Sequence, residues 1–205
     1  MFQFQVGLGY SPFLMSAPIQ IAWVTTDLVA TERALTNLLG ARKWVRLPEV
    51  HFGADANTYR GRPCDFVASI SLSYLQDVQL ELIEPVRGGP NIYSDFLHEH
   101  GAGLHHICID AVDEAGFEAA LRNATAHGAE IAAQGTMPGG MQFAYVSDPQ
   151  AGVPYVEIAH IPDEIRAFFD YIKQEQRGAQ RTRPPGRRPT SRGTTIPMYW
   201  SSVSG

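Results

Sequence analysis

The sequence predicts an α+β protein built from two βαβββ modules in tandem, and three observations support this. The order strand, helix, three strands occurs twice along the chain. The two copies match at their beginnings with an offset of 86 residues and at their ends with an offset of 76. The matched segments are Gln20-Ile21-Ala22-Trp23 with His106-Ile107-Cys108-Ile109, and Leu80-Glu81-Leu82-Ile83 with Val156-Glu157-Ile158-Ala159.

Each element of the first copy follows from its residue pattern. Residues 19–25 are rich in Ile, Val and Trp, which favours a strand, and Asp27 can cap the helix that an apolar stripe predicts up to Gly40. Further strands are expected over 43–47, 65–74 and 78–84. The polar stretch 51–63 is expected to be a loop, and the wider segment 48–64 is either a lid or disordered.

The second copy repeats this order after a short helix predicted over 92–100. A strand over 104–110 is followed by a helix that Asp113 caps and Gly128 ends, and by strands over 130–133, 141–146 and 155–160. The chain therefore divides into a leader (1–17), a first module (18–87), a linker helix (88–103), a second module (104–161), a C-terminal helix (162–176) and a basic tail (177–205) that is expected to be flexible.

Size and composition are those of an ordinary globular protein. The chain has 205 residues, of which 44% are hydrophobic and 18% charged. No apolar run approaches the roughly 18 residues that a membrane helix needs, and the leader lacks the basic start of a secretion signal. The two cysteines, Cys64 and Cys108, provide no disulfide framework, so we expect a cytoplasmic protein.

Charge is divided unevenly along the chain. Six arginines and no acidic residue lie in 177–205, whereas 1–176 hold ten basic and 21 acidic side chains. A body with a net charge of −11 repels a phosphate backbone, so nucleic acid is not expected as the main partner. The Arg-, Pro- and Gly-rich tail is typical of a disordered segment or of an arm lying on an acidic neighbour, with RNA contact as a weaker alternative.

Polar residues occupy the matched positions on the first and last strands of both modules: Gln20, Glu81, His106 and Glu157. Burying carboxylates among apolar neighbours is costly unless they are paired or bind a cation. Two carboxylates, an imidazole and an amide oxygen suit one divalent ion of Zn, Co, Ni, Mn, Fe or Mg. Taken singly, Glu81 could equally form a salt bridge and Gln20 a backbone hydrogen bond. Strand alternation places His105 on the face opposite to His106.

Three stretches carry a family resemblance: Gly101-Ala102-Gly103-Leu104-His105-His106-Ile107-Cys108, Ser94-Asp95-Phe96-Leu97, and Glu81-Leu82-Ile83-Glu84-Pro85. They resemble the methylmalonyl-CoA epimerases of the vicinal-oxygen-chelate (glyoxalase/bleomycin-resistance) superfamily, over about residues 18–160. The resemblance implies a cupped mixed sheet whose first and last strands supply the metal ligands, here Gln20, Glu81, His106 and Glu157. Gln20 stands where the epimerases carry a histidine, so the set is similar in type and order to that of eukaryotic glyoxalase I.

The resemblance also implies a metal-dependent isomerase, epimerase or lyase that removes a proton next to a carbonyl group. Glu157 is expected to be the ligand that also acts as the base, with Glu81 opposite it across the metal. Asp65 is a further catalytic candidate, since it lies near the position of the catalytic glutamate of the epimerases. The expected substrate is a small carbonyl or acyl compound, with a coenzyme A thioester as one option, and the expected assembly is a homodimer.

Two other functions stay open at this point. Ring-cleaving dioxygenases of the superfamily use iron held by two His and one Glu, so Gln20 counts against that reaction. Other members bind and sequester drugs such as bleomycin in the same cleft without a metal. The pair Glu81 and Glu157 counts against sequestration, because no cation would then offset the burial of these carboxylates.

Overall fold

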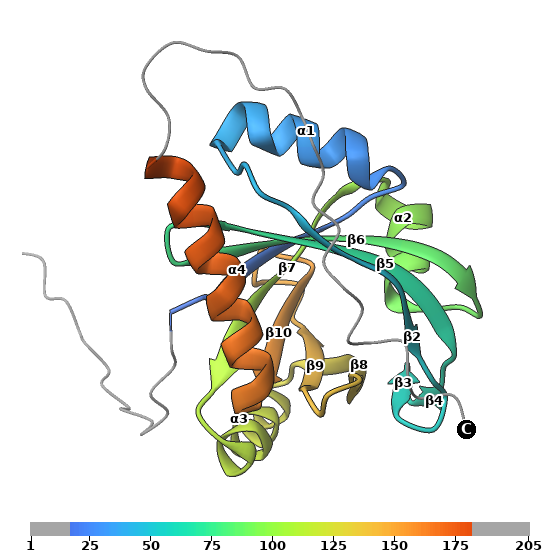
Figure 1. Ribbon diagram of the computed structural model, residues 1–205. Helices are drawn as coiled ribbons and strands as arrows, with labels where there is room; N and C mark the ends of the chain where they lie inside the picture. The colour runs from blue at the N-terminus through green and yellow to red at the C-terminus, as the bar shows by residue number, and fades with distance from the viewer. Residues whose placement is uncertain (1–16, 182–205) are drawn as a thin grey trace, which may run out of the picture.

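A computed structural model describes residues 17–181 and confirms the α+β fold, with two βαβββ modules forming one curled mixed sheet (Figure 1). Residues 1–16 and 182–205, which include nearly all of the predicted leader and most of the predicted tail, lie outside the described residues. None of the described helices is long and apolar enough to span a membrane. The elements in chain order are β1 (Gln20–Val24), α1 (Leu28–Leu39), β2 (Val45–Phe52), β3 (Asn57–Tyr59), β4 (Arg62–Pro63), β5 (Phe66–Leu75), β6 (Val78–Gly88), α2 (Ile92–His100), β7 (Gly103–Ala111), α3 (Glu114–Ala126), β8 (Glu130–Thr136), β9 (Gln142–Ser147), β10 (Tyr155–His160) and α4 (Asp163–Arg181).

The two modules join along their first strands. The sheet order is β2-β5-β6-β1-β7-β10-β9-β8-β3-β4, so that β2-β5-β6-β1 of the first module mirrors β8-β9-β10-β7 of the second. Strand β1 runs parallel to β6 and antiparallel to β7, and β10 runs parallel to β7. The four central strands, β6, β1, β7 and β10, are therefore the strands that carry the four predicted metal ligands.

Helices α1 and α3 begin where the sequence predicts and end within about two residues of the predicted glycines. Asp27 accepts a hydrogen bond from the Ala30 backbone N–H at the start of α1, and Gly40 ends this helix in the left-handed region at φ 80°. Asp113 caps α3 in the same way, through the backbone N–H of Gly116. These caps set the points at which the chain turns from each first strand onto one face of the sheet.

Helices cover both faces of the sheet. We call the face that carries Glu81, His106 and Glu157 the inner face. Helix α3 packs on the outer face of the second module, where Phe117 and Leu121 meet buried strand residues. On the inner face, α2 and α4 contribute to a core rich in aromatic side chains. In Figure 1, α4 crosses in front of the sheet, whereas α1 and α3 lie above and below it.

The prediction of a loop over 51–63 is wrong in part. Strand β2 continues to Phe52, and the following residues form β3 and β4. Strand β3 pairs with β8 of the other module, where Asn57 lies opposite Gly135, and the Arg60 backbone N–H donates to the Ala132 carbonyl at 2.8 Å. Because this pairing joins residues far apart in sequence, the turn-forming residues of the segment gave no local sign of it.

Helix α4 runs five residues beyond the predicted end at 176, to Arg181. Four ion pairs anchor its described part to the body: Arg166 with Asp110 at 2.7 Å, Lys173 and Arg177 with Asp77 at 2.7 and 2.8 Å, and Lys43 with Glu175 at 2.6 Å. Ile172, which is 1% exposed, packs between these anchors into the inner core. The first residues of the predicted tail therefore continue the helix.

Gly135→Ala should weaken the β3–β8 junction. A Cβ atom at this position would lie 2.0 Å from Asn57 Oδ1 and 2.8 Å from the Ala56 carbonyl oxygen, and the backbone atom cannot simply swing away. We expect a loss of roughly 1–3 kcal/mol in the free energy of unfolding, typical of overpacking. Urea denaturation measures this loss, and faster hydrogen exchange at the Thr58 amide would localise it. Gly103→Ala is the control, because its Cβ would meet no atom within 4 Å; equal effects of the two substitutions would contradict the prediction.

Candidate metal centre

Three of the four predicted ligands meet on the inner face. His106 Nε2 lies 3.1 Å from Glu157 Oε2 and 3.5 Å from Glu81 Oε2. The possible ligand atoms of these three residues all lie within 4.8 Å of one another. The strand register explains the grouping: Ala22 of β1 lies opposite both Glu81 and His106, so a small side chain separates two of the three ligands. Glu157 approaches from β10, where it lies opposite Cys108.

The cluster is buried, and the Nε2 atom of His106 faces the two carboxylates. The exposed fraction of the side chain is 0% for His106, 5% for Glu157 and 13% for Glu81. Although both carboxylates are close, His106 Nε2 has no hydrogen-bond partner of suitable geometry among the described residues. A buried ring nitrogen that converges with two carboxylate oxygens is the arrangement expected of a cation site.

The charges of the cluster require a compensating positive charge. Burial lowers the pKa of His106, but the adjacent carboxylates of Glu157 and Glu81 outweigh this and raise it to about 9. Burial also raises the pKa of Glu81, an effect that the charge of His106 opposes and the charge of Glu157 reinforces. In the absence of a metal, the cluster therefore retains protons at neutral pH. A divalent cation can replace those protons, because it supplies positive charge between the same three groups.

Gln20 lies on the inner face next to the cluster and is 5% exposed. Its Nε2 donates to Gln79 Oε1 at 2.8 Å, and Gln79 Nε2 donates in turn to the Tyr74 hydroxyl at 3.0 Å. This chain of hydrogen bonds orients the amide of Gln20 through its nitrogen. The role of Gln20 as a fourth ligand stays a prediction.

Asp65 is not brought to the cluster. It precedes β5 at the rim of the sheet, and its side chain is 59% exposed. Its Oδ2 lies 3.0 Å from His51 Nε2, so its described partner is another surface group. The position of Asp65 therefore gives no support to the catalytic role that the resemblance implied.

The expectation that His105 faces away from His106 is wrong. A β-bulge in β7 shifts the register between Ala22 and Trp23, so that His105 becomes an extra residue without an opposite partner on β1. His105 Nδ1 lies 2.9 Å from His106 Nδ1, and both side chains are fully buried. Burial lowers the pKa of His105 well below 6.5. Simple alternation missed this residue because the bulge interrupts it.

Two tyrosines that were not among the predicted site residues also border the cluster. The hydroxyls of Tyr93 and Tyr145 are 2.8 Å apart and buried, and the Tyr145 ring centroid lies 4.9 Å from that of His106. Burial raises the pKa of both tyrosines well above 10, and the nearby carboxylates add to this. Both hydroxyls therefore stay protonated. Tyr145 lies on the strand expected over 141–146 and Tyr93 on the helix expected over 92–100.

The space beside these tyrosines is small. Tyr93 and Tyr145 line a cavity of about 10 Å³ together with residues of β3 and the aromatic core. A cavity of this size accommodates about one water molecule. A larger molecule can therefore enter this cavity only if the side chains around it move.

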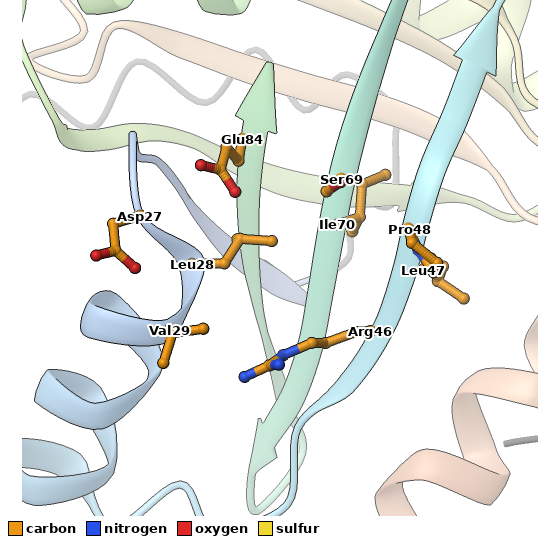
Figure 2. Close-up of a pocket in the computed structure, with 9 residues that line it drawn as sticks. All are labelled: Asp27, Leu28, Val29, Arg46, Leu47, Pro48, Ser69, Ile70 and Glu84. Atoms are coloured by element: carbon orange, nitrogen blue, oxygen red, sulfur yellow. The ribbon is translucent and has the colours of Figure 1, made fainter. Parts of the chain in front are cut away.

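A larger cavity, of about 240 Å³, lies elsewhere, between α1 and strands β2, β5 and β6 (Figure 2). Asp27, Arg46 and Glu84 are among the residues that line it. Glu84 is three residues beyond Glu81 on β6, and alternation puts the two side chains on opposite faces of the sheet. This cavity is therefore separate from the metal-ligand cluster.

Comparisons with known proteins bear on the fold. The sequence model of the Glyoxalase/Bleomycin resistance protein/Dioxygenase superfamily matches residues 19–145. No curated protein sequence matches the chain. The structure is similar to methylmalonyl-CoA epimerase from Mycobacterium tuberculosis, with 14% identity and a TM-score of 0.54 over 77% of this chain and 95% of the other. It is also similar to a hypothetical protein from Bacillus halodurans C-125, with 17% identity and a TM-score of 0.51 over 72% of this chain and 95% of the other.

The metal-free protein should lose stability as the pH rises through 9. The pKa of His106 is about 9 in the folded state against 6.5 for a free imidazole. The stabilisation that this shift provides is complete below pH 6.5 and is lost as the pH passes the folded-state pKa, a loss on the order of 3 kcal/mol. Urea denaturation of chelator-treated protein at about pH 6.5 and about pH 9.5 measures it. His106→Gln should remove this component; the same pH dependence in the variant would show that other groups cause it.

Proposed function

Because the chain belongs to the glyoxalase/bleomycin resistance protein/dioxygenase superfamily, we propose that it is a metal-dependent enzyme that removes a proton from a carbon next to a carbonyl group. One observation carries the proposal: the buried His106 Nε2 lacks a hydrogen-bond partner among the described residues, yet it faces the carboxylates of Glu81 and Glu157 at 3.5 and 3.1 Å. These three residues would hold one divalent ion.

The donor set fits such an ion. One imidazole nitrogen and two carboxylates suit Zn, Co, Ni, Mn, Fe or Mg, and Gln20 is available on the same face to add an amide oxygen. When bound, the ion acts as a Lewis acid on a substrate carbonyl oxygen and so stabilises the enolate that proton removal leaves. A metal-free sequestering protein would lack this cation, and its buried carboxylates would depend on retained protons alone.

Glu157 is the residue that we propose as the base. It lies opposite Tyr145 on β9, and Tyr145 lines the small inner cavity. A substrate that enlarges this cavity would therefore meet the Glu157 side of the cluster. The hydroxyls of Tyr93 and Tyr145 are hydrogen-bonded to each other, so one of the two O–H groups is left to donate to a substrate oxygen there.

Glu81 is the natural second carboxylate of the reaction. Glu81 and Glu157 lie at similar distances from His106 Nε2, 3.5 and 3.1 Å, and burial raises the pKa of Glu81 above its usual value. A carboxyl group with a raised pKa can return a proton to the substrate from another direction. This division of roles supports an isomerase or epimerase that does not need Asp65, whose side chain is 59% exposed.

The proposed substrate is a small carbonyl or acyl compound. The inner cavity of about 10 Å³ is lined mainly by aromatic and other apolar side chains, so the reacting end of the substrate must be compact and must displace some of them. Methylmalonyl-CoA is one candidate, motivated by the similarity to the M. tuberculosis epimerase. At this identity the similarity concerns the fold, so the substrate is a matter for experiment.

Elemental analysis of the purified protein tests the metal. We expect about one divalent ion per chain, held by the three-residue cluster. Glu157→Ala and His106→Ala should each abolish it, since each removes a ligand that no described neighbour replaces. Asp65→Ala is the control and should keep the full metal content. A metal content that is unchanged in Glu157→Ala and His106→Ala would overturn the site.

Solvent-deuterium exchange tests the reaction. The metal-loaded protein should exchange the proton next to the carbonyl in at least one member of a panel of 2-substituted acyl compounds, including methylmalonyl-CoA. Glu157→Gln, which keeps the size of the side chain but cannot accept the proton, should slow exchange by roughly 10²–10⁴-fold. Asp65→Asn should leave the rate unchanged. Equal losses in the two variants would contradict the assignment of the base.

A further inference from the structure

The bulge in β7 places two imidazoles in direct contact at the metal-ligand cluster. His105 Nδ1 and His106 Nδ1 are 2.9 Å apart, a hydrogen-bonding distance. Both side chains have an exposed fraction of 0%, so water does not compete for this contact. A regular strand would have pointed His105 to the other face, and the register shift at Ala22 is what brings the rings together.

One proton is shared between the two Nδ1 atoms, so the tautomer of one ring determines the tautomer of the other. If His106 Nδ1 carries it, His106 donates to His105 and a neutral His106 keeps a lone pair on Nε2. If His105 Nδ1 carries it, a neutral His106 must hold its own proton on Nε2, which points toward Glu81 and Glu157 and would block an ion. Only the first arrangement is compatible with coordination through Nε2.

We propose that His105 is a positioning residue for the metal: its Nδ1 accepts the Nδ1–H of His106 and thereby keeps His106 Nε2 open to the ion. This inference rests on the proposed metal site and deepens it. Metal-bound histidines generally donate their second ring N–H to an acceptor that sets tautomer and orientation. Here the acceptor is the adjacent residue of the same strand.

The surroundings of His105 suit an orienting role. Four aromatic rings hold its imidazole, with centroids 5.2 Å away for Tyr93, 5.0 Å for Phe96, 5.6 Å for Tyr145 and 4.8 Å for Tyr155. Such a cage restricts rotation of the ring, so that Nδ1 stays directed at His106. It comes from α2, β9 and β10 and thus couples the orientation of His106 to elements outside the central strands.

Three variants of the full chain distinguish the role of His105 as a hydrogen-bond acceptor from the role of its ring in packing. His105→Leu removes the acceptor and should weaken Zn²⁺ or Co²⁺ binding roughly 10–100-fold, measured by competition with a chelating dye. His105→Asn places an amide oxygen near the position of Nδ1 and should keep the affinity within about threefold of the wild type. Phe96→Leu loosens the cage without removing the acceptor; it should lower the melting temperature and weaken metal binding less than His105→Leu does.

The outcomes distinguish this inference from the proposed function. A wild-type protein that binds no metal overturns both. A wild type that binds metal, together with a His105→Leu variant that binds equally well, overturns only the role of His105. If His105→Asn binds metal as weakly as His105→Leu, the loss of affinity comes from packing. That result would also overturn the role of His105. If His105→Leu does not fold, nitrogen NMR of the zinc-loaded wild type decides: the role requires the proton on His106 Nδ1 and on His105 Nε2, and the opposite tautomers contradict it.

Discussion

The antiparallel pairing of β1 with β7 is the interaction on which the rest of the structure depends. It joins two modules that each hold one or more polar residues on an otherwise apolar strand face. Ala22 stands in the centre of this junction, opposite both Glu81 and His106, and its small side chain leaves the space in which the ligand atoms converge. A larger side chain here would occupy the space between Glu81 and His106.

The ionisable side chains at this junction are costly to bury. Two carboxylates and an imidazole share a site from which water is largely excluded, and each ionised group is unfavourable there unless its neighbours balance it. Retained protons achieve this balance in the metal-free state, as the raised pKa of His106 shows. The divalent cation that we propose would achieve it while freeing the carboxylates to move protons. In that proposal, the same burial that makes the site costly for folding also serves the reaction.

The sequence predicted the parts of the site that depend on periodicity and repetition. The matched positions of the two modules identified Glu81, His106 and Glu157, because a repeated fold repeats the direction in which strand side chains point. It could not predict His105, since a bulge is a tertiary adjustment that reverses alternation at one residue. The resemblance also suggested Asp65 as a catalytic candidate, and the structure places its side chain at the surface.

The fold was predictable for similar reasons and with a similar exception. Caps, glycines and apolar stripes located every described helix, whereas β3 was missed because its partner, β8, belongs to the other module.

The pairing of β3 of the first module with β8 of the second has a consequence for folding of the chain. A free β8 would present unpaired backbone groups to other molecules, a common starting point for aggregation. Since residues of the first module shield this edge, the second module is protected only once the whole cup has closed. Closure requires contacts between distant segments, which form slowly. The two modules are therefore not independent folding units, because each needs the other to complete its sheet.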